Sequence, residues 1–189
     1  MKSKRVHELI TCPQFQNGFY DESRHGGHAV EAMLAEVLEK YGFSAQVEIE
    51  YKGIVGHPDF VKTTDNYVEF IEVKNTGQIS YSHILQASMY KSLLHKIRSV
   101  PVIGYILYVK FRVVVGDSPI VPKWVQDLGM QYVFLPLDGG ANYVNWGLFR
   151  ISFKSKLAGP YCVHCRNTEC KIKQVILNGP NGMLNVSEE

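Results

Sequence analysis

The segment that decides the fold is YVEFIEVK, residues 67–74. Its β-branched and aromatic residues are typical of a β-strand, and side chains two residues apart on a strand point to the same face. Glu72 and Lys74 are therefore expected to project together, whereas Ile71 and Val73 project into the opposite layer. An acid beside a lysine near the end of an apolar strand is an unusual surface for packing alone, although an exposed surface ion pair is the plain alternative.

Periodic segments on either side of this strand predict an α/β arrangement. Apolar residues at three- and four-residue steps indicate helices, and alternating or β-branched runs bounded by turn residues indicate strands. The expected order is a helix at 28–41, strands at 45–51, 54–61 and 67–74, a helix at 80–97, and a buried strand with its extension at 102–115. Residues 116–160 are expected to form loops with short strands or helices.

A second carboxylate, Asp59, lies on the strand-like segment that precedes Glu72. A hairpin between the two segments places Asp59 beside Glu72 across the ladder. Two carboxylates at one spot repel each other unless a cation lies between them, and hard oxygen ligands suit Mg²⁺ or Mn²⁺. A metal ion there activates water and stabilises charge on a phosphate, and Lys74 is expected to orient that water or to neutralise the phosphate.

Residues on the two neighbouring helices are candidates for the same site. Gln86 and Tyr90 are four residues apart and share a helix face that can turn toward the lysine or a DNA backbone. The alternative is that Tyr90 closes the core and Gln86 is solvated. His28 follows a glycine pair at the start of the first helix, where an imidazole beside two carboxylates favours Mn²⁺ over Mg²⁺. A capping or surface role is its alternative, and His25 and His57 are rival ligands.

Three of the four cysteines are close together in the sequence, and the fourth is distant from them. Cys162, Cys165 and Cys170 occupy a nine-residue window, and Cys12 lies near the N-terminus. Such tight thiolate spacing suits a tetrahedral centre, either zinc or an iron–sulfur cluster. Because three cysteines cannot complete a four-thiolate site, Cys12 is the expected fourth ligand, and the centre then joins the two ends of the chain. Separate reduced thiols are the alternative.

This ordered set of residues resembles the RecB-like exonucleases associated with CRISPR systems, the Cas-four family, and their relatives in archaeal viruses. The members of the set, in chain order, are Cys12, His28, Asp59, Glu72-Val73-Lys74, Gln86, Tyr90, Cys162, Cys165 and Cys170. The resemblance covers residues 12 to 170, which is nearly the whole chain. It departs from the family where Ala29 follows His28 and Glu31 comes later, and where the gap before Cys170 is shorter than in many relatives.

The resemblance implies an α/β restriction-endonuclease-like PD-(D/E)xK core, with a mixed sheet flanked by helices. Residues 1–189 would form a single nuclease domain, in which segments 1–27 and 155–175 make a cysteine-cluster subdomain. The four cysteines would hold an iron–sulfur cluster, usually of the four-iron, four-sulfur type. The metal site, for Mn²⁺ or Mg²⁺, would consist of His28, Asp59, Glu72 and the Val73 carbonyl, with Lys74 catalytic and Gln86 and Tyr90 on the helix motif.

The resemblance also implies an activity and partners. The expected reaction is cleavage of single-stranded DNA, exonucleolytic from the 5′ end, which would trim DNA for CRISPR spacers alongside CRISPR adaptation proteins. Candidate DNA contacts, chosen from position only, are Arg24, Lys91, Lys96, Tyr20 and Tyr81. Two other hypotheses are a DNA-binding module without activity and a zinc-bound structural protein.

The overall composition is compatible with these expectations. A chain of 189 residues is long enough for one domain with a core that needs no disulfides, and a net charge of +2 permits local nucleic-acid contacts without demanding them. No apolar run is long enough for a transmembrane helix, and the first residues lack the apolar core of a signal peptide. A cytoplasmic location is expected, in which cysteines are more often metal ligands than disulfides.

Overall fold

The computed structural model describes most of the first three quarters of the chain. The described residues are 3–6, 9, 24–138, 140–142, 144, 145 and 148, with the backbone alone for 24–28. All four cysteines and Tyr20 lie outside this set, as do the side chains of Arg24, His25 and His28. The proposed cysteine-cluster subdomain, 1–27 with 155–175, therefore falls almost entirely outside the described residues.

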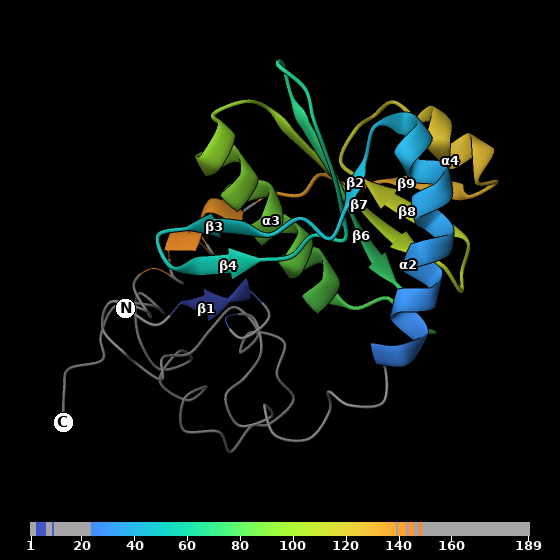
Figure 1. Cartoon of the computed structure of the whole chain (residues 1–189), viewed down its shortest axis with the longest axis horizontal. Coiled ribbons are helices and arrows are strands. Elements are labelled where there is room, and N and C mark those ends of the chain that lie inside the picture. Colours follow the sequence, from blue (N-terminus) through green and yellow to red (C-terminus); the bar gives the residue numbers. More distant parts are fainter. Residues whose placement is uncertain are drawn as a thin grey trace, which may run out of the picture.

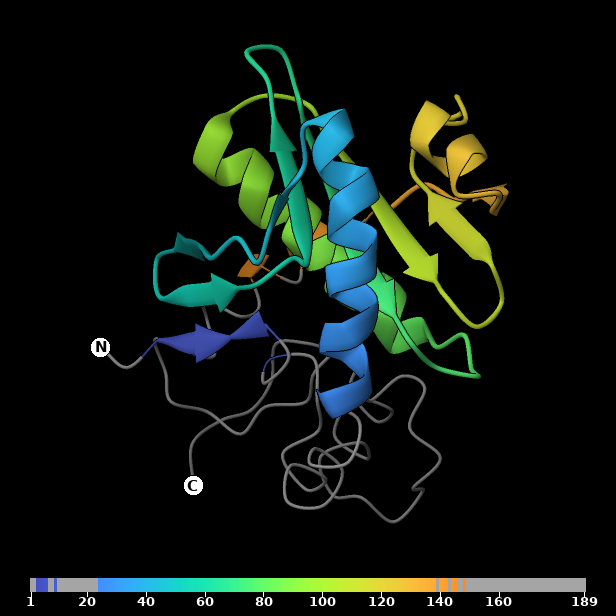
Figure 2. The same cartoon turned by 45° about the vertical axis from the view of Figure 1, so that its right-hand side comes forward.

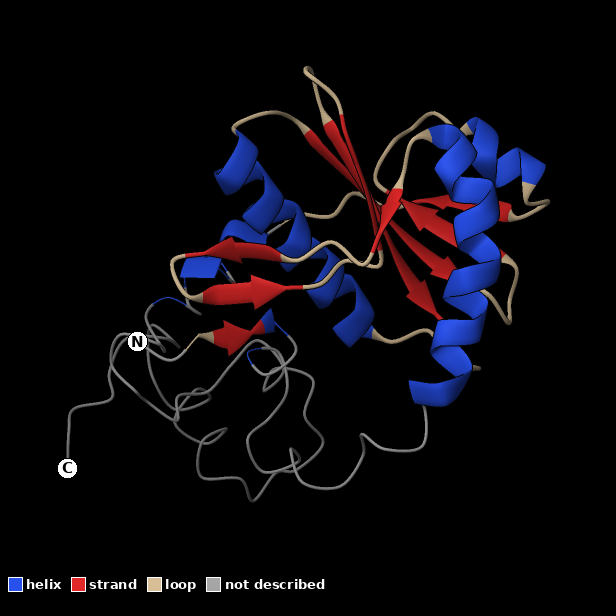
Figure 3. Cartoon of the chain, in the orientation of Figure 1, coloured by secondary structure: helices blue, strands red, loops and turns tan. Residues whose placement is uncertain are grey.

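A six-stranded mixed sheet forms the centre of the fold (Figures 1 and 3). Its strands, in spatial order, are β2 (Ser44–Ala45), β5 (Phe60–Thr63), β6 (Val68–Lys74), β7 (Val102–Tyr108), β8 (Val113–Gly116) and β9 (Gln131–Phe134). The pairs β6–β7 and β8–β9 are parallel, and the other neighbours are antiparallel. The parallel β6–β7 pair requires a crossover, which helix α3 (Tyr81–Arg98) provides.

Helices cover both faces of this sheet, as Figures 1 and 2 show from two directions. One face packs against α2 (Arg24–Leu38) and the short α4 (Lys123–Asp127), through a core that includes Leu34, Ile71 and Trp124. The other face packs against α3, through a core that includes Phe70 and Met89. Adjacent residues of β6 thus enter different layers, as the two-residue period of a strand requires. The chain is a mixed α/β fold with sheets flanked by helices.

Local sequence signals explain where α3 begins and ends. The Ser80 side chain accepts a hydrogen bond from the Ser82 backbone amide at 3.1 Å, which satisfies one of the unpaired donors at the helix start. At the other end, Ser99 adopts a left-handed conformation with φ of 57°, and its amide donates to the His95 carbonyl. These two caps set the ends of α3, whose first turn follows the end of β6 by a short loop.

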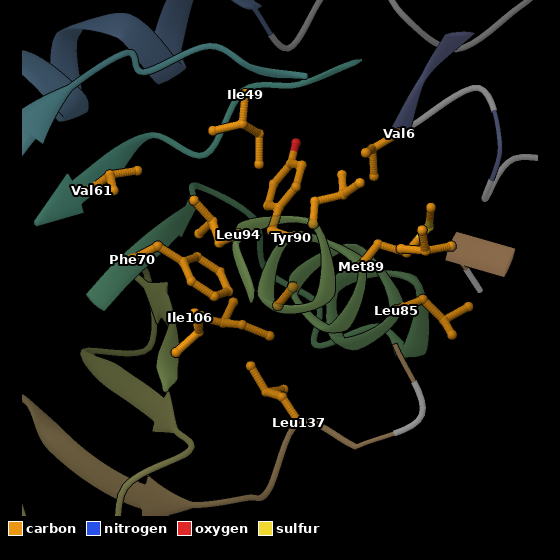
Figure 4. Packing of buried hydrophobic residues seen from close by; sticks show 14 of the residues in the cluster. Val6, Ile49, Val61, Phe70, Leu85, Met89, Tyr90, Leu94, Ile106 and Leu137 are labelled. Carbon is orange, nitrogen blue, oxygen red and sulfur yellow. The ribbon is translucent and has the colours of Figure 1, made fainter. Parts of the chain in front are cut away.

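A second, three-stranded sheet with the order β1-β4-β3 lies beside α3 (Figure 1). It contains β1 (Lys4–Arg5), β3 (Ile49–Tyr51) and β4 (Ile54–Gly56), and the turn at Lys52-Gly53 has positive φ angles of 48° and 83°. Figure 4 shows the Tyr90 ring of α3 beside Ile49. A Cβ atom at Gly56 would lie 2.8 Å from that ring, so glycine permits this close approach.

Two of the expected strands are each divided between the two sheets. The segment 45–51 is interrupted at Gln46, which has a φ of 52°, so that β2 and β3 lie in different sheets. The segment 54–61 is interrupted between β4 and β5 at His57-Pro58-Asp59, where proline cannot donate a ladder hydrogen bond. The prediction of one strand each at 45–51 and 54–61 was therefore wrong, whereas the third predicted strand, 67–74, is the single strand β6.

Two other boundaries also differ from the sequence-based expectation. The run 102–115 is a β7–β8 hairpin rather than one extended strand, because the chain turns at 109–112 with Arg112 at a φ of 53°. The first helix begins at Arg24 instead of His28 and continues as the 3-10 helix η2 (Glu39–Tyr41) before Gly42 ends it with a φ of 84°. None of the helices in the described part of the chain has the length and apolar character needed to cross a membrane.

Candidate active site

Asp59 and Glu72 lie on adjacent segments of the sheet. The β5–β6 register pairs Phe60 with Ile71, so the next position along the ladder sets Asp59 opposite Glu72. The Val73 backbone amide donates to Asp59 Oδ2 at 2.6 Å. The Asp59 carbonyl in turn accepts from the Gln46 amide at 2.8 Å, which anchors the backbone on the β2 side. The predicted hairpin between the two carboxylates is confirmed.

Both carboxyl groups are held in surroundings that disfavour charge. Burial and the nearby Glu72 raise the pKa of Asp59 to about 8, against the opposing effect of the Val73 amide. Burial also raises the pKa of Glu72, and the charge of Lys74 opposes that rise. Glu72 is 4% exposed. Without a compensating cation, these surroundings favour the protonated form of Asp59.

Lys74 lies within a chain of hydrogen bonds that links β6 to α3. Its ammonium donates to Glu72 Oε1 at 2.6 Å and to Gln86 Oε1 at 2.9 Å. Gln86 Nε2 then donates to the Tyr90 hydroxyl at 3.0 Å. The chain confirms that Glu72 and Lys74 share one face of the strand, and it shows that Gln86 contacts the lysine instead of being solvated.

Tyr90 combines the two roles considered for it. The residue is 4% exposed and belongs to the core that packs against α3. Its ring meets Phe70 edge-on, with the ring centroids 6.2 Å apart. Its hydroxyl nevertheless ends the hydrogen-bond chain that begins at Glu72. Burial, followed by the charge of Glu72, raises the pKa of this hydroxyl well above its ordinary range, so it remains a neutral partner of Gln86.

A third carboxylate, Glu31 on α2, acts on the same site. Its charge raises the pKa of both Asp59 and Glu72, which places it close to the acidic pair. Sequence reasoning treated Glu31 only as a departure from the family pattern. The available signal was its spacing, because Glu31 follows His28 by three residues and so shares a helix face with it.

The three candidate histidine ligands differ in what the structure shows of them. The side chains of His25 and His28 lie outside the described atoms, although both residues belong to α2. His57 is exposed, and its Nε2 lies 3.6 Å from Glu48 Oε2. Within the described side chains, no cluster of three or more histidine, cysteine, aspartate or glutamate groups is arranged to hold a metal ion.

One carboxylate oxygen of Glu72 nonetheless has the surroundings expected of a cation ligand. Glu72 Oε2 is buried and has no hydrogen-bond partner in the part of the chain that the structure describes. A buried carboxylate oxygen without a partner is costly, and a divalent cation held by Glu72 and Asp59 would remove that cost. The oxygen donors on Asp59 and Glu72, with the Val73 carbonyl between Glu72 and Lys74, fit Mg²⁺ or Mn²⁺ chemically.

Two of the candidate DNA contacts that the structure describes, Lys91 and Lys96, contact residues outside this site. Lys91 pairs with Asp117 at 2.6 Å. The Lys96 ammonium lies 5.8 Å from the centroid of the Tyr51 ring. Tyr81, at the first turn of α3, is 43% exposed and is the described candidate nearest in sequence to Lys74.

Comparison with known proteins gives a likeness of fold. No protein-family model matches the sequence, and no curated protein matches it. The crystal structure of SSO0001 is similar to this chain, with a TM-score of 0.50 and 17% sequence identity over 92% of this chain and 87% of that one. At this level of identity the similarity concerns the fold alone.

Proposed function

We propose that this protein is a metal-dependent DNA nuclease with a restriction-endonuclease-like PD-(D/E)xK core, related to the RecB-like exonucleases of the Cas-four type. The observation that carries the proposal is the position of Glu72. This buried carboxylate stands between Asp59 and Lys74, gives one oxygen to the lysine, and has a second oxygen without a described partner. That arrangement serves a cation and a reacting phosphate better than it serves packing.

Four groups would hold the cation: the side chains of His28, Asp59 and Glu72 and the carbonyl of Val73. The two carboxylates of this set, Asp59 and Glu72, face one another across the β5–β6 ladder. A divalent cation there would supply a water of lowered pKa and would neutralise charge on the phosphate. The Val73 amide keeps Asp59 Oδ2 in place at 2.6 Å, which leaves the other carboxylate oxygen of Asp59 for the ion.

Lys74 would act on the reacting phosphate and the attacking water. A lysine ammonium has three N–H donors, and two of them point to Glu72 and Gln86. The third is available for a phosphate oxygen or for the water. Because two fixed acceptors orient the ammonium before DNA binds, little reorganisation is needed when negative charge develops.

Gln86 and Tyr90 would position Lys74. The amide group accepts from the lysine through its oxygen and donates to the tyrosine through its nitrogen. This arrangement fixes which end of the amide faces the lysine. The Tyr90 ring is held in turn by Phe70 and by the close approach of Gly56.

The cysteine pattern supports an iron–sulfur cluster, of the four-iron, four-sulfur type, on Cys12, Cys162, Cys165 and Cys170. This part of the proposal rests on sequence spacing and on the family resemblance. The same resemblance supports single-stranded DNA as substrate, cleavage from the 5′ end, and a role in preparing DNA for CRISPR spacers with adaptation proteins.

The experiment that tests the proposal is a cleavage assay on end-labelled single-stranded DNA with purified protein and Mn²⁺. Glu72→Gln is the matched variant, because it retains an acceptor for Lys74 but loses the charge that a cation needs. The expected result is shortening from the 5′ end by the parent and none by Glu72→Gln. DNA binding by the parent without metal-dependent cleavage would instead favour the binding-module hypothesis.

A further inference from the structure

A third side chain on α3 shares the helix face that carries Gln86 and Tyr90. His83 precedes Gln86 by three residues and Tyr90 by seven, so the three side chains form a row along the helix. His83 lies in the first turn of α3, just beyond the end of β6, and is half-buried. His83 is not among the site residues predicted from the sequence, and the role proposed above for Lys74 does not involve it.

Tyr108 holds the His83 ring from the neighbouring strand. The β6–β7 register pairs Lys74 with Tyr108, so the lysine and the tyrosine emerge side by side from parallel strands. His83 Nδ1 lies 3.2 Å from the Tyr108 hydroxyl, and the two rings are 5.7 Å apart and tilted by 46°. Tyr108 is fully buried, which makes it a rigid support.

In this contact either the Tyr108 hydroxyl or an Nδ1–H of His83 can be the donor. The buried Tyr108 hydroxyl is a donor that needs an acceptor, and His83 Nδ1 is the partner that the structure gives it. When Nδ1 accepts, the neutral imidazole must carry its hydrogen on Nε2. With the Tyr108 hydroxyl as the donor, His83 has an Nε2–H donor on the side of the ring away from Tyr108.

His83 remains neutral beside the lysine. Burial and then the charge of Lys74 lower the pKa of the imidazole to about 4. Its protonation state therefore does not change near neutral pH. The ammonium is also close enough to His83 for its charge to act on the ring.

We infer that His83 is a further phosphate-contacting residue of this site. In this arrangement Tyr108 fixes the tautomer of His83 that directs Nε2–H to the DNA strand bound at Lys74. The inference rests on the proposed nuclease function and deepens it. A neutral donor adds a hydrogen bond to an anionic oxygen without adding a second positive charge beside the lysine. The ligand class is a phosphodiester whose bridging phosphate lies between Lys74 and the first turn of α3.

Paired substitutions at His83 separate donor chemistry from packing. His83→Gln keeps an N–H near the place of Nε2, whereas His83→Leu keeps bulk without a donor. The expected result is a rate of DNA cleavage at least about tenfold lower in His83→Leu, with substantial recovery in His83→Gln. Tyr108→Phe, which removes the hydroxyl that selects the tautomer, should lie between the parent and His83→Leu.

Two controls check that the variants are folded and that the effect is local. Thermal stabilisation by Mn²⁺ should equal that of the parent in His83→Leu and His83→Gln. His95→Leu changes a second histidine of α3. His95 lies twelve residues after His83, or about 18 Å along the helix at a rise of about 1.5 Å per residue. The cleavage rate of His95→Leu should match that of the parent. A His83→Leu protein that binds Mn²⁺ like the parent and cuts at the parent rate would overturn the inference.

Nitrogen NMR gives a readout that needs no cleavage. In ¹⁵N-labelled protein, the His83 signals are assigned by their loss in His83→Gln, and Nε2 should be the protonated nitrogen at neutral pH. A single-stranded oligonucleotide added with Ca²⁺ should shift that Nε2 signal. A proton on Nδ1, or an Nε2 signal that saturating DNA leaves unchanged, would contradict the inference. Should the parent cut no DNA, the proposed function fails, and the response of Nε2 to DNA still decides the role of His83.

Discussion

The Lys74 ammonium donates to Glu72 Oε1 at 2.6 Å, and the two residues are two positions apart on the same strand. The same ammonium donates to Gln86 Oε1 at 2.9 Å. The lysine is thus oriented by one acceptor from its own strand and by another from α3. Surface ion pairs of this spacing contribute little, but here both partners of the pair are largely buried, with side-chain exposures of 17% and 5%. The geometry favours preorganisation of a positive charge at one point above the sheet.

Removing the Gln86 acceptor should loosen Lys74 without unfolding the chain. Gln86→Leu keeps most of the side-chain volume on a half-buried face but releases both the lysine and the Tyr90 hydroxyl. We expect the cleavage rate to fall about tenfold, since small misplacements of a catalytic group are costly, with the affinity for DNA nearly unchanged. Single-turnover cleavage and a binding titration measure the two effects.

Gln126→Leu is the matched control for that prediction. Gln126 lies exposed on α4, which packs on the opposite face of the sheet from α3. Its cleavage rate should equal that of the parent. Equal losses in both variants would assign the effect of Gln86→Leu to general disturbance instead of to Lys74.

The raised pKa of Asp59 makes the stability of the metal-free protein depend on pH. An acid whose pKa rises from 3.8 to about 8 on folding binds its proton more tightly in the folded state. The stabilisation that this bound proton gives the folded state is therefore complete below about pH 3.8. It is lost as pH rises through the folded-state pKa of about 8. Asp59→Asn, which keeps an acceptor for the Val73 amide, should stabilise the metal-free protein near pH 8 by about 1 kcal/mol or more.

Denaturant unfolding in a chelator, from about pH 5 to about pH 8, measures this effect. The advantage of Asp59→Asn over the parent should grow with pH, and added Mn²⁺ should reverse it by stabilising the parent alone. A parent that becomes more stable than Asp59→Asn as pH rises, without metal, would show that Asp59 is not held in a site that disfavours its charge.

The choice between His28 and His25 as metal ligand is open to direct measurement. A site of carboxylates with an imidazole accepts Mn²⁺ readily, so Mn²⁺ should support cleavage at least as well as Mg²⁺, whereas Ca²⁺ should not. His28→Ala should weaken Mn²⁺ binding by about ten- to a hundredfold, as measured by calorimetry, and should leave the fold intact. Weakening in His25→Ala but not in His28→Ala would reassign the ligand.

The cysteine cluster is expected to be coloured. Protein purified without oxygen should absorb broadly at roughly 400 nm, from charge transfer between thiolate and iron. Cys165→Ala should lose this absorption and lower the melting temperature. Stoichiometric zinc without iron, in protein produced with ample iron and without oxygen, would refute the iron–sulfur assignment and favour the zinc-bound structural hypothesis.

The parts of the site that sequence predicted are those set by local geometry. The shared face of Glu72 and Lys74 follows from the two-residue period of a strand, and the hairpin beside Asp59 follows from the turn signals between two short extended segments. Both are present. The contact from Gln86 to Lys74 was one of two alternatives, because helix spacing shows which residues share a face but not which way that face turns.

The parts that sequence missed depend on packing between distant segments. Glu31 raises the pKa of Asp59 because α2 packs against the sheet. His83 contacts Tyr108 because α3 connects the parallel strands β6 and β7 and packs over them. The β7–β8 turn also escaped detection, since Arg112 takes a positive φ without a glycine or proline to mark it. Glu31 and His83 each share a helix face with a predicted site residue, but that spacing alone does not show what the face packs against.

The central claim is that Lys74 acts on the reacting phosphate and not on the rest of the DNA. Binding draws on many phosphate contacts, so the loss of one changes affinity little. The loss of one preorganised charge at a developing anion costs a factor of about 10² to 10³ in rate. The decisive measurement compares Lys74→Ala with the parent in both DNA affinity and Mn²⁺-dependent cleavage of single-stranded DNA, on the same preparations. The account predicts nearly equal affinity with cleavage at least about a hundredfold slower, and cleavage by Lys74→Ala at the parent rate would contradict it.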